Sequence, residues 1–297
     1  MNEFGLIERL KVFQNLSSAV PVGIGDDAAV LRLDARRYQL LTTDMLVEDV
    51  HFTRDQLPRQ VGYKAMACSI SDIAAMGGLP QAAVISIGVP GHIRQNYILQ
   101  IYKGLHACAR AFGVSLVGGD TVRAQKFVIN VALLGQVEKK YLVLRSGAKP
   151  GDSIFVTGPL GGSLRSGRHL RFIPRVKEAR FLVTHFKPGA MMDISDGLAG
   201  DLGHILRSSR VGACLQEQAV PCYPGVDIRQ ALTDGEDFEL LFTLSPAQSA
   251  RLAARARRAP LAGCHCIGTI TADCGRLLLQ GADGRCRKLA ARGFVHF

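Results

Sequence analysis

Apolar and polar positions along the first half of the chain follow two different patterns. Five apolar segments are read as strands: residues 22–33 and 38–46, which acids and glycines interrupt, and residues 81–90, 114–121 and 127–137. Two further segments, 61–78 and 94–112, have apolar residues at helical spacing, and the first of them ends on a glycine pair. The sequence therefore predicts an N-terminal domain that mixes strands and helices.

The second half repeats this alternation after a turn-rich segment, RSGAKPGD, at residues 145–152. Strands are predicted at 153–158 and 237–244, a helix after the motif MMDISDG at 191–197, and another helix at 247–258. With 297 residues, of which 47% are hydrophobic, the chain is long enough for two cores. We predict an α+β protein with two domains that contain mixed sheets, residues 1–144 and 145–297.

Charge and composition exclude several classes of function. No run of about 18 apolar residues occurs. The first residues include acids at amphipathic spacing, unlike a secretory signal. The formal charge of +11 favours anionic partners, but the arginines of 251–260 alternate with alanine as on a solvated helix face, and no nucleic-acid motif accompanies them. We expect a cytoplasmic protein that binds neither membranes nor nucleic acids.

Four of the eight cysteines gather late in the chain, at Cys264, Cys266, Cys274 and Cys286. Structural zinc sites usually have paired ligands such as C-x-x-C, and this chain has no such pair. The sequence CHCIGTIT favours a strand at 264–271 over a zinc site.

Acids and glycines occur together in five short motifs: GIGDD (23–27), TTD (42–44), SISD (69–72), GGDT (118–121) and MDISDG (192–197). Each motif alone is more often a turn or a helix cap than a site. If the five converge, their carboxylates cannot all stay ionised unless a cation neutralises them. Oxygen ligands suit Mg²⁺, and the glycines allow backbone N–H groups to approach phosphate oxygens. Together the motifs predict magnesium-assisted phosphoryl transfer, without a P-loop or the protein-kinase motifs.

The longer motifs around these turns resemble those of one enzyme family. GIGDDAAV, TTDMLVEDVHF, YKAMACSISDIAAMGG, GGDT, RSGAKPGD, MDISDGLAGDLGHI and DGEDFELLFT occur in the order typical of bacterial thiamine-monophosphate kinases, relatives of aminoimidazole-ribonucleotide synthetase. The resemblance runs from about residue 4 to the end. It implies an N-terminal mixed sheet that forms a barrel with its twin in a homodimer, and a C-terminal α/β domain. It also implies that ATP and thiamine monophosphate give ADP and thiamine diphosphate.

The same resemblance implies roles for individual residues. A cluster of several Mg²⁺ ions would be bound by Asp27, Thr42, Thr43, Asp44, Asp72, Asp120 and Asp193, and a further ion by Asp196. Asp44, Asp72, Asp120 and Asp193 would act catalytically through these ions. ATP would contact Gly119, Asp120, Arg145 and Ser195, and thiamine monophosphate would contact His51, Glu236 and Phe294. Asp201 is then expected to be an ordinary helix residue.

Two departures from the family pattern and several alternatives stay open. Only LRSG separates 158–163 from 168–176, where the family has a longer segment, and Phe294 stands where tyrosine is frequent. His51 could instead be a structural histidine, and Phe294 could pack in a core. The acceptor phosphate is already ionised, so we expect direct in-line transfer without a strong general base. The alternatives are a related ATP-dependent enzyme with another phosphate acceptor, or a nucleotide-binding relative without turnover.

Overall fold

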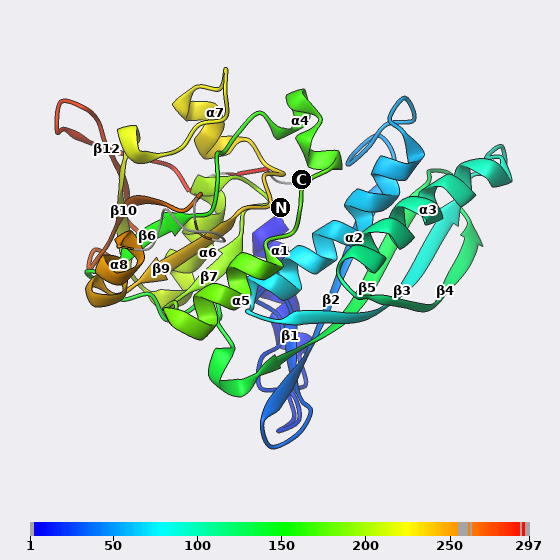
Figure 1. Ribbon diagram of the computed structural model, residues 1–297, viewed down its shortest axis with the longest axis horizontal. Helices are drawn as coiled ribbons and strands as arrows, with labels where there is room; N and C mark the ends of the chain where they lie inside the picture. Colours follow the sequence, from blue (N-terminus) through cyan, green and yellow to red (C-terminus); the bar gives the residue numbers. More distant parts are fainter. Residues whose placement is uncertain (1–2, 255–260, 262, 292, 295–297) are drawn as a thin grey trace.

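Two mixed β-sheets organise the computed structural model of the chain (Figure 1), which describes residues 3–254, 261, 263–291, 293 and 294. The N-terminal sheet has the order β1-β2-β5-β3-β4, in which only β3 and β4 are parallel neighbours. Its strands are β1 (Ala29–Arg32), β2 (Arg37–Val47), β3 (Leu79–Val89), β4 (Ser115–Arg123) and β5 (Val128–Glu138). α1 (Glu3–Leu10) and the 3₁₀ turn η1 (Lys11–Phe13) precede them.

Helices α2 (Pro58–Ala75) and α3 (Gln95–Ala111) lie side by side across one face of this sheet (Figure 1). α2 begins with a proline, which is favourable there because a backbone N–H in the first turn would have no partner within the helix. Gly77 follows the helix with a positive φ of 74°. Gly62 and Gly104 allow the two helices to touch, because a Cβ on either would lie 2.0 Å from a carbonyl oxygen of the other helix.

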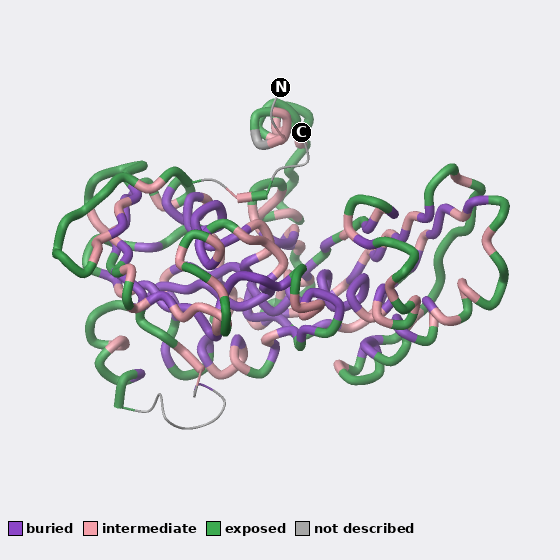
Figure 2. The backbone as a smooth tube through the Cα atoms, turned by 90° about the horizontal axis from the view of Figure 1, so that it is seen from above, coloured by how far each residue is buried: buried purple, intermediate pink, exposed green. Residues whose placement is uncertain are grey.

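The opposite face of the N-terminal sheet is largely open to solvent. Along β5 buried residues alternate with half-buried ones, as expected for a sheet covered on one face. Apolar side chains on the open face include Met45, which is 55% exposed, together with Leu41, Val84 and Val122. In Figure 2 the lobe that holds this sheet mixes buried and exposed backbone, whereas buried backbone fills the middle of the other lobe.

The C-terminal sheet has seven strands in the order β12-β11-β8-β10-β6-β9-β7, with β8 and β11 parallel. The strands are β6 (Ser153–Val156), β7 (Met191–Asp193), β8 (Gly212–Gln216), β9 (Leu240–Leu244), β10 (His265–Thr271), β11 (Leu277–Gln280) and β12 (Cys286–Lys288). The helices are α4 (Ser163–Ser166), α5 (Val176–His185), α6 (Leu198–Ser209), α7 (Ile228–Thr233) and α8 (Pro246–Ala253), with 3₁₀ turns η2 (Lys139–Tyr141), η3 (Arg168–Leu170) and η4 (Glu217–Ala219). Both sheets are mixed, as predicted.

Helix α2 connects the two sheets because it contacts both of them. Besides β2, β3 and β5 it packs against α5, η3 and β7 of the C-terminal half. One cluster of buried apolar side chains accordingly joins α2 residues such as Met66 and Ile70 to Phe155 and Phe242 of the C-terminal sheet. Chemical groups on α2 therefore face residues from both halves.

Most predicted elements occur close to their expected positions. The first strand is shorter than predicted, because Gly23–Asp27 forms a turn with only isolated bridges and β1 starts at Ala29. The helix predicted at 247–258 is α8, and the part of the prediction at 255–260 lies outside the described residues. The predicted domain boundary at residue 145 falls between β5 and β6.

Candidate active site

Three carboxylates from distant parts of the chain meet where α2 crosses β7. Asp27 precedes β1, Asp72 lies on α2, and Asp193 ends β7. Each offers an oxygen, and these oxygens all lie within 4.8 Å of one another. The structure thus brings together residues from three of the five acidic motifs. Their role as magnesium ligands stays a prediction.

Hydroxyl groups from the neighbouring predicted residues hold this cluster in place. The Thr42 hydroxyl on β2 donates to Asp72 Oδ2 at 2.5 Å, and the Ser71 hydroxyl donates to Asp193 Oδ2 at the same distance. Asp44, two residues after Thr42, points to the same side and lies close to Ser69 and Asp72. The cluster therefore includes a fourth acid, again from a predicted motif.

The acids of this cluster are shielded from solvent, and some of their carboxylate oxygens have no hydrogen-bond partner. Among the described residues, Asp27 Oδ2 and Asp44 Oδ2 are buried without a hydrogen-bond partner. Burial raises the pKa of Asp193 to about 7, and the negative charge of Asp27 adds to this rise. Burial and neighbouring carboxylates also raise the pKa of Asp44 and of Asp72. Orphaned buried carboxylate oxygens and mutual repulsion are what a cation would relieve, so the donor set fits Mg²⁺.

Arg145 is the main cation next to the cluster. Its Nη2 donates to Asp27 Oδ1 at 2.7 Å, and its backbone N–H donates to both carboxylate oxygens of Asp26 at 3.2 Å. Its Nε is buried without a hydrogen-bond partner among the described residues. The sequence interpretation missed Asp26, although the double aspartate of GIGDD was the available signal. Burial and the negative charge of Asp27 raise the pKa of Asp26 to about 7.

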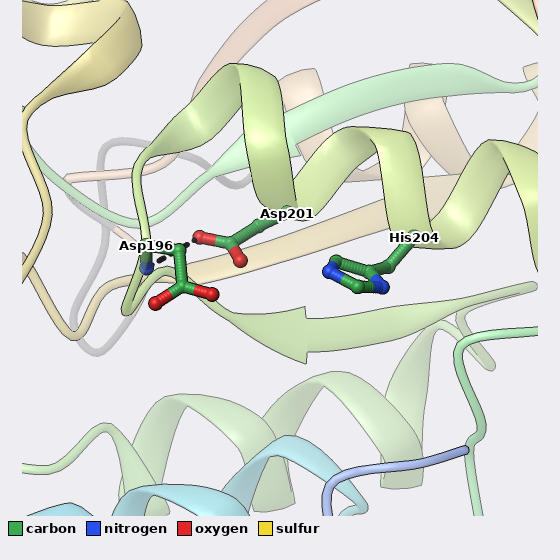
Figure 3. A group of neighbouring side chains, drawn as sticks. All are labelled: Asp196, Asp201 and His204. Atoms are coloured by element: carbon green, nitrogen blue, oxygen red, sulfur yellow. Dashed lines mark hydrogen bonds between the residues drawn. The ribbon is translucent and has the colours of Figure 1, made fainter. Parts of the chain in front are cut away.

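A second group of metal-ligating side chains lies at the start of α6, where Asp196, Asp201 and His204 converge (Figure 3). Asp201 is 1% exposed, and its Oδ2 accepts from the backbone N–H groups of Asp196 and Gly197, both at 3.1 Å. The expectation that Asp201 is an ordinary helix residue is therefore wrong. Its carboxylate fixes the turn that presents Asp196, a contact that helical spacing alone does not reveal.

His204 is the third member of that group, and the tautomer of its ring decides which hydrogen-bonding group it presents. Burial and the nearby arginines lower its pKa to about 3, so the ring is neutral. Arg207 Nη2 lies 3.0 Å from His204 Nδ1 and can only donate, so Nδ1 accepts and the ring proton is on Nε2. In this arrangement His204 offers a hydrogen-bond donor rather than a lone pair.

Two of the predicted thiamine contacts are joined by a buried lysine. Lys64 Nζ on α2 donates to the His51 carbonyl oxygen at 2.9 Å and forms an ion pair with Glu236. The His51 ring is oriented by the Val47 N–H, which donates to Nδ1 at 3.0 Å. Glu236 N donates to the carbonyl oxygen of Ser195 at 2.6 Å, so the predicted ATP and thiamine contacts share one piece of backbone.

The residues on both sides of the shortened segment 164–167 pack onto the loop that contains Glu236. Asp237 accepts from Gly161 N at 2.8 Å and from Arg168 Nη2 at 2.5 Å, and the rings of Phe172 and Phe238 stack with centroids 4.0 Å apart. These contacts fix the wall of the site next to Glu236. They do not involve the three clustered carboxylates.

A cavity of about 1380 Å³ opens beside Asp27 and receives residues from both halves of the chain. Its lining includes Asp26, Asp27, Thr42, Thr43, Arg145, Asp196, His204 and Phe294. Phe294 is 50% exposed, so the alternative of core packing is wrong for this residue, and its N–H donates to the Asp196 carbonyl oxygen at 2.8 Å. The volume is larger than that of most single-ligand pockets, which is consistent with two ligands.

Gly119, Asp120 and Thr43 are predicted residues that the structure does not bring to the cluster. Asp120 lies on β4, which β3 and β5 separate from β2, a distance on the order of 14 Å at the usual strand spacing. Asp120 also pairs in register with Ser86 and through it with Asn130 and Met45, on the open face of the sheet. Thr43 Oγ1 faces the same side and donates to Asn130 Oδ1 at 3.0 Å. At Gly119 a Cβ would lie 1.8 Å from the Ile85 carbonyl oxygen, so the sheet itself requires glycine.

The four late cysteines, which the sequence analysis considered as zinc ligands, belong to neither of the two metal-ligating groups found among the described residues. Cys264 precedes β10, whose strand includes Cys266, as the pattern predicted. All eight cysteines have free thiols. No helix within the described residues is long and apolar enough to span a membrane.

Comparison with known proteins gives a consistent result. Residues 25–137 match the family model "AIR synthase related protein, N-terminal domain". The chain is 38% identical over 274 residues to the thiamine-monophosphate kinase of Bacillus subtilis, covering 82% of this chain and 84% of that protein. It is 33% identical to the enzyme of Buchnera aphidicola over 100% of this chain and 99% of that protein.

Among solved structures, "AaThiL complexed with AMPPCP and TMP" superposes with a TM-score of 0.85 at 32% identity, over 100% of this chain and 97% of that chain. The match therefore extends over both sheets and over the carboxylates between them. The chain belongs to the thiamine-monophosphate kinase family.

Proposed function

We propose that the chain transfers the γ-phosphoryl group of ATP to the phosphate of thiamine monophosphate, which yields thiamine diphosphate and ADP. The observation that carries this proposal is the buried meeting of Asp27, Asp72 and Asp193 beside Arg145 and a cavity large enough for two ligands. Clustered carboxylates next to an arginine suit the anionic groups of a phosphoryl transfer.

The direct test is to incubate the purified protein with ATP, Mg²⁺ and thiamine monophosphate and to measure thiamine diphosphate as its fluorescent thiochrome derivative. Product that disappears in excess chelator supports the proposal. Bound ATP without product would favour the non-catalytic alternative. ATP consumption only with another phosphate compound would favour a related enzyme with a different acceptor.

Several Mg²⁺ ions would be held by Asp27, Asp44, Asp72 and Asp193, with Thr42 as a further oxygen donor and Asp196 at a separate position. This set is supported by the orphaned oxygens of Asp27 and Asp44 and by the raised pKa values of the others. Bound magnesium would supply charge neutralisation for the two phosphate groups as they approach.

The chain's own residues would mainly orient the two anions. The acceptor oxygen of a phosphate monoester is already ionised near neutral pH, so none of these residues needs to act as a strong base. Arg145 is held by Asp26 and Asp27, which leaves its buried Nε as a donor for a phosphate oxygen. Ser195 and Asp196 would face the nucleotide from the start of α6. Direct in-line transfer between aligned phosphates follows, without a phosphorylated enzyme.

His51, Glu236 and Phe294 would bind the thiamine part of the acceptor. Glu236 is an anion, and the thiazolium ring of thiamine carries a positive charge, so the two attract each other. The half-exposed ring of Phe294 offers an apolar surface to a flat heterocycle.

We further propose that the chain forms a homodimer through the open face of its N-terminal sheet. Leu41, Met45, Val84 and Val122 place exposed apolar surface on that face, a property typical of interfaces. In such a dimer Asp120 and Gly119 would act at the site of the partner subunit, which would explain why they lie away from the cluster in their own chain. The free thiols support a reducing, cytoplasmic location.

A further inference from the structure

Lys64 is a buried charged side chain to which no role has been assigned. It lies in the middle of α2, its side chain is 0% exposed, and its ammonium group contacts the His51 carbonyl oxygen and the Glu236 carboxylate. A buried ammonium is costly unless its charge and its donors are satisfied. Here one partner belongs to the turn after β2 and the other to the C-terminal half, so Lys64 links both halves at the acceptor side of the site.

The backbone at Glu236 has an unfavourable conformation, and the ion pair between Lys64 and Glu236 helps to hold it. Glu236 has φ 65° and Phe238 has φ 52°, values that L-residues other than asparagine and aspartate rarely adopt. Such strain persists when surrounding contacts determine it. For Glu236 the contacts are the hydrogen bond from its N–H to Ser195 and the ion pair with Lys64. Lys64 is therefore the side-chain contact that fixes where the Glu236 carboxylate points.

Charge balance around Glu236 leads to the same residue. The negative charge of Glu236 contributes to the raised pKa of Asp44, which places Glu236 close to the carboxylate cluster. A carboxylate in such surroundings is repelled by the neighbouring acids and tends to turn towards water. Lys64 lies on α2, one turn before Cys68 and two turns before Asp72, and gives Glu236 a fixed positive partner.

We propose that Lys64 positions the acceptor substrate: its ammonium group holds the Glu236 carboxylate next to His51, so that both can bind the thiamine moiety. This inference rests on the proposed function, in which His51 and Glu236 contact thiamine monophosphate. Lys64 itself need not touch the substrate. Because Arg145 and Asp196 lie on the nucleotide side, the effect should be confined to the acceptor.

The test is Lys64→Met, which keeps the apolar stem and removes the charge. We expect the KM for thiamine monophosphate to rise about tenfold or more, the effect of one lost charge-assisted contact. The KM for ATP should change less than about twofold on the same scale. Lys103→Met, at an exposed position of α3, is the matched control and should behave like the wild type. Thermal unfolding of each variant checks its stability.

Glu236→Gln and the double variant Lys64→Met/Glu236→Gln show whether Lys64 acts through Glu236. If it does, the double variant has the same KM for thiamine monophosphate as Glu236→Gln alone, because the two changes remove one interaction. The double variant contains no unpaired buried charge, so it also serves if Lys64→Met alone does not fold. Fully additive effects, or equal effects on the KM of both substrates, would overturn the proposal.

These outcomes also separate the two levels of inference. A wild-type protein that makes no thiamine diphosphate overturns the proposed function, and the role of Lys64 with it. An active wild-type enzyme whose Lys64→Met variant keeps its KM for thiamine monophosphate overturns the role of Lys64 alone.

Discussion

At the residue scale, Asp44 gives the sharpest test of the carboxylate cluster. Its buried Oδ2 has no hydrogen-bond partner among the described residues, and burial raises its pKa. Asp44→Asn keeps the size of the side chain but removes a charge that a cation would need. We expect kcat to fall by about a hundredfold or more, comparable to the loss of one group that stabilises charge in a transition state.

The metal-free Asp44→Asn variant should be at least as stable as the wild type, because a repulsive buried charge has been removed. Asp34→Asn, in the exposed turn between β1 and β2, is the control: it should leave kcat unchanged and slightly lower stability, because the Asp34 carboxylate accepts hydrogen bonds from Arg36 and Arg37. Normal turnover by Asp44→Asn would show that this acid does not serve the reaction.

A pH-dependent stability follows from Asp193, whose pKa is about 7 in the folded protein and 3.8 ordinarily. Because the folded state binds the proton more tightly, protonated Asp193 favours folding at low pH, and this contribution is lost as the pH rises through about 7. Mg²⁺ requires the ionised carboxylate, so its stabilising effect should grow in the opposite direction. The increase in melting temperature on adding Mg²⁺ should therefore be larger at pH 8 than at pH 6.

Differential scanning fluorimetry in chelator and in Mg²⁺ at pH 6, 7 and 8 measures this. Asp193→Asn should weaken both the pH dependence of the metal-free protein and the effect of Mg²⁺. Equal stabilisation by Mg²⁺ at pH 6 and pH 8 would argue that the clustered acids do not bind it.

The charged residues that the sequence identified and those that it missed differ in a simple physical way. Asp27, Asp72 and Asp193 stand in motifs of acid and glycine, which predict turns and ligand contacts from the sequence alone. Lys64 and Asp201 instead matter because of the groups they contact: Lys64 pairs with the Glu236 carboxylate, and Asp201 accepts from the N–H groups that precede α6. Helical periodicity places such residues on a helix but does not show which buried group they meet.

At the element scale, the start of α6 contains the most exacting local structure of the site. Asp201→Ala would leave the N–H groups of Asp196 and Gly197 without their acceptor, at a cost of about 1–3 kcal/mol. The turn that presents Asp196 and Ser195 should then loosen, and we expect the KM for ATP to rise several-fold. Asp201→Asn, which keeps an acceptor oxygen, should lie between Asp201→Ala and the wild type.

The control for this prediction is another helix cap of the same kind. Asp227 accepts from Gln230 N at 2.8 Å at the exposed start of α7, so Asp227→Ala removes a cap away from the site. It should lower the melting temperature without changing the KM for ATP. If both alanine variants lose stability and neither changes this KM, Asp201 is a helix cap and nothing more.

The elements themselves followed from the sequence better than their arrangement. Strands and helices such as β2, β5, α2 and α3 are long and periodic, so local patterns predict them. The strand orders place β5 between β2 and β3, and β10 between β6 and β8. These pairings are non-local and depend on how complete faces are buried, which no local pattern contains.

At the scale of the whole molecule, Asp120 raises a question that a single chain does not answer. It belongs to the same set of predicted ligands as Asp44, yet it lies three strands away on the opposite face of the sheet. If dimer formation brings Asp120 to the site of the other subunit, each site combines Asp44 of one subunit with Asp120 of the other. The prediction is then that two inactive variants restore each other.

Asp44→Asn and Asp120→Asn should each be inactive alone. Co-expressed with different affinity tags, they form mixed dimers in which one site has both defects and the other has none. An equal mixture should regain about a quarter of wild-type activity, since half of the dimers are mixed and half of their sites are intact. Purification through both tags should raise this to about one half.

If both residues served the same subunit, every site in a mixed dimer would contain one defect and no activity would return. That result, with mixed dimers demonstrated by sedimentation and by both tags, would refute the shared site while leaving the dimer in place. Met45→Asp tests the dimer separately, because a charge at the centre of the open face should disfavour pairing. A monomeric Met45→Asp variant that retains full activity would show that one chain completes its own site, and Asp120 would then have no part in the reaction.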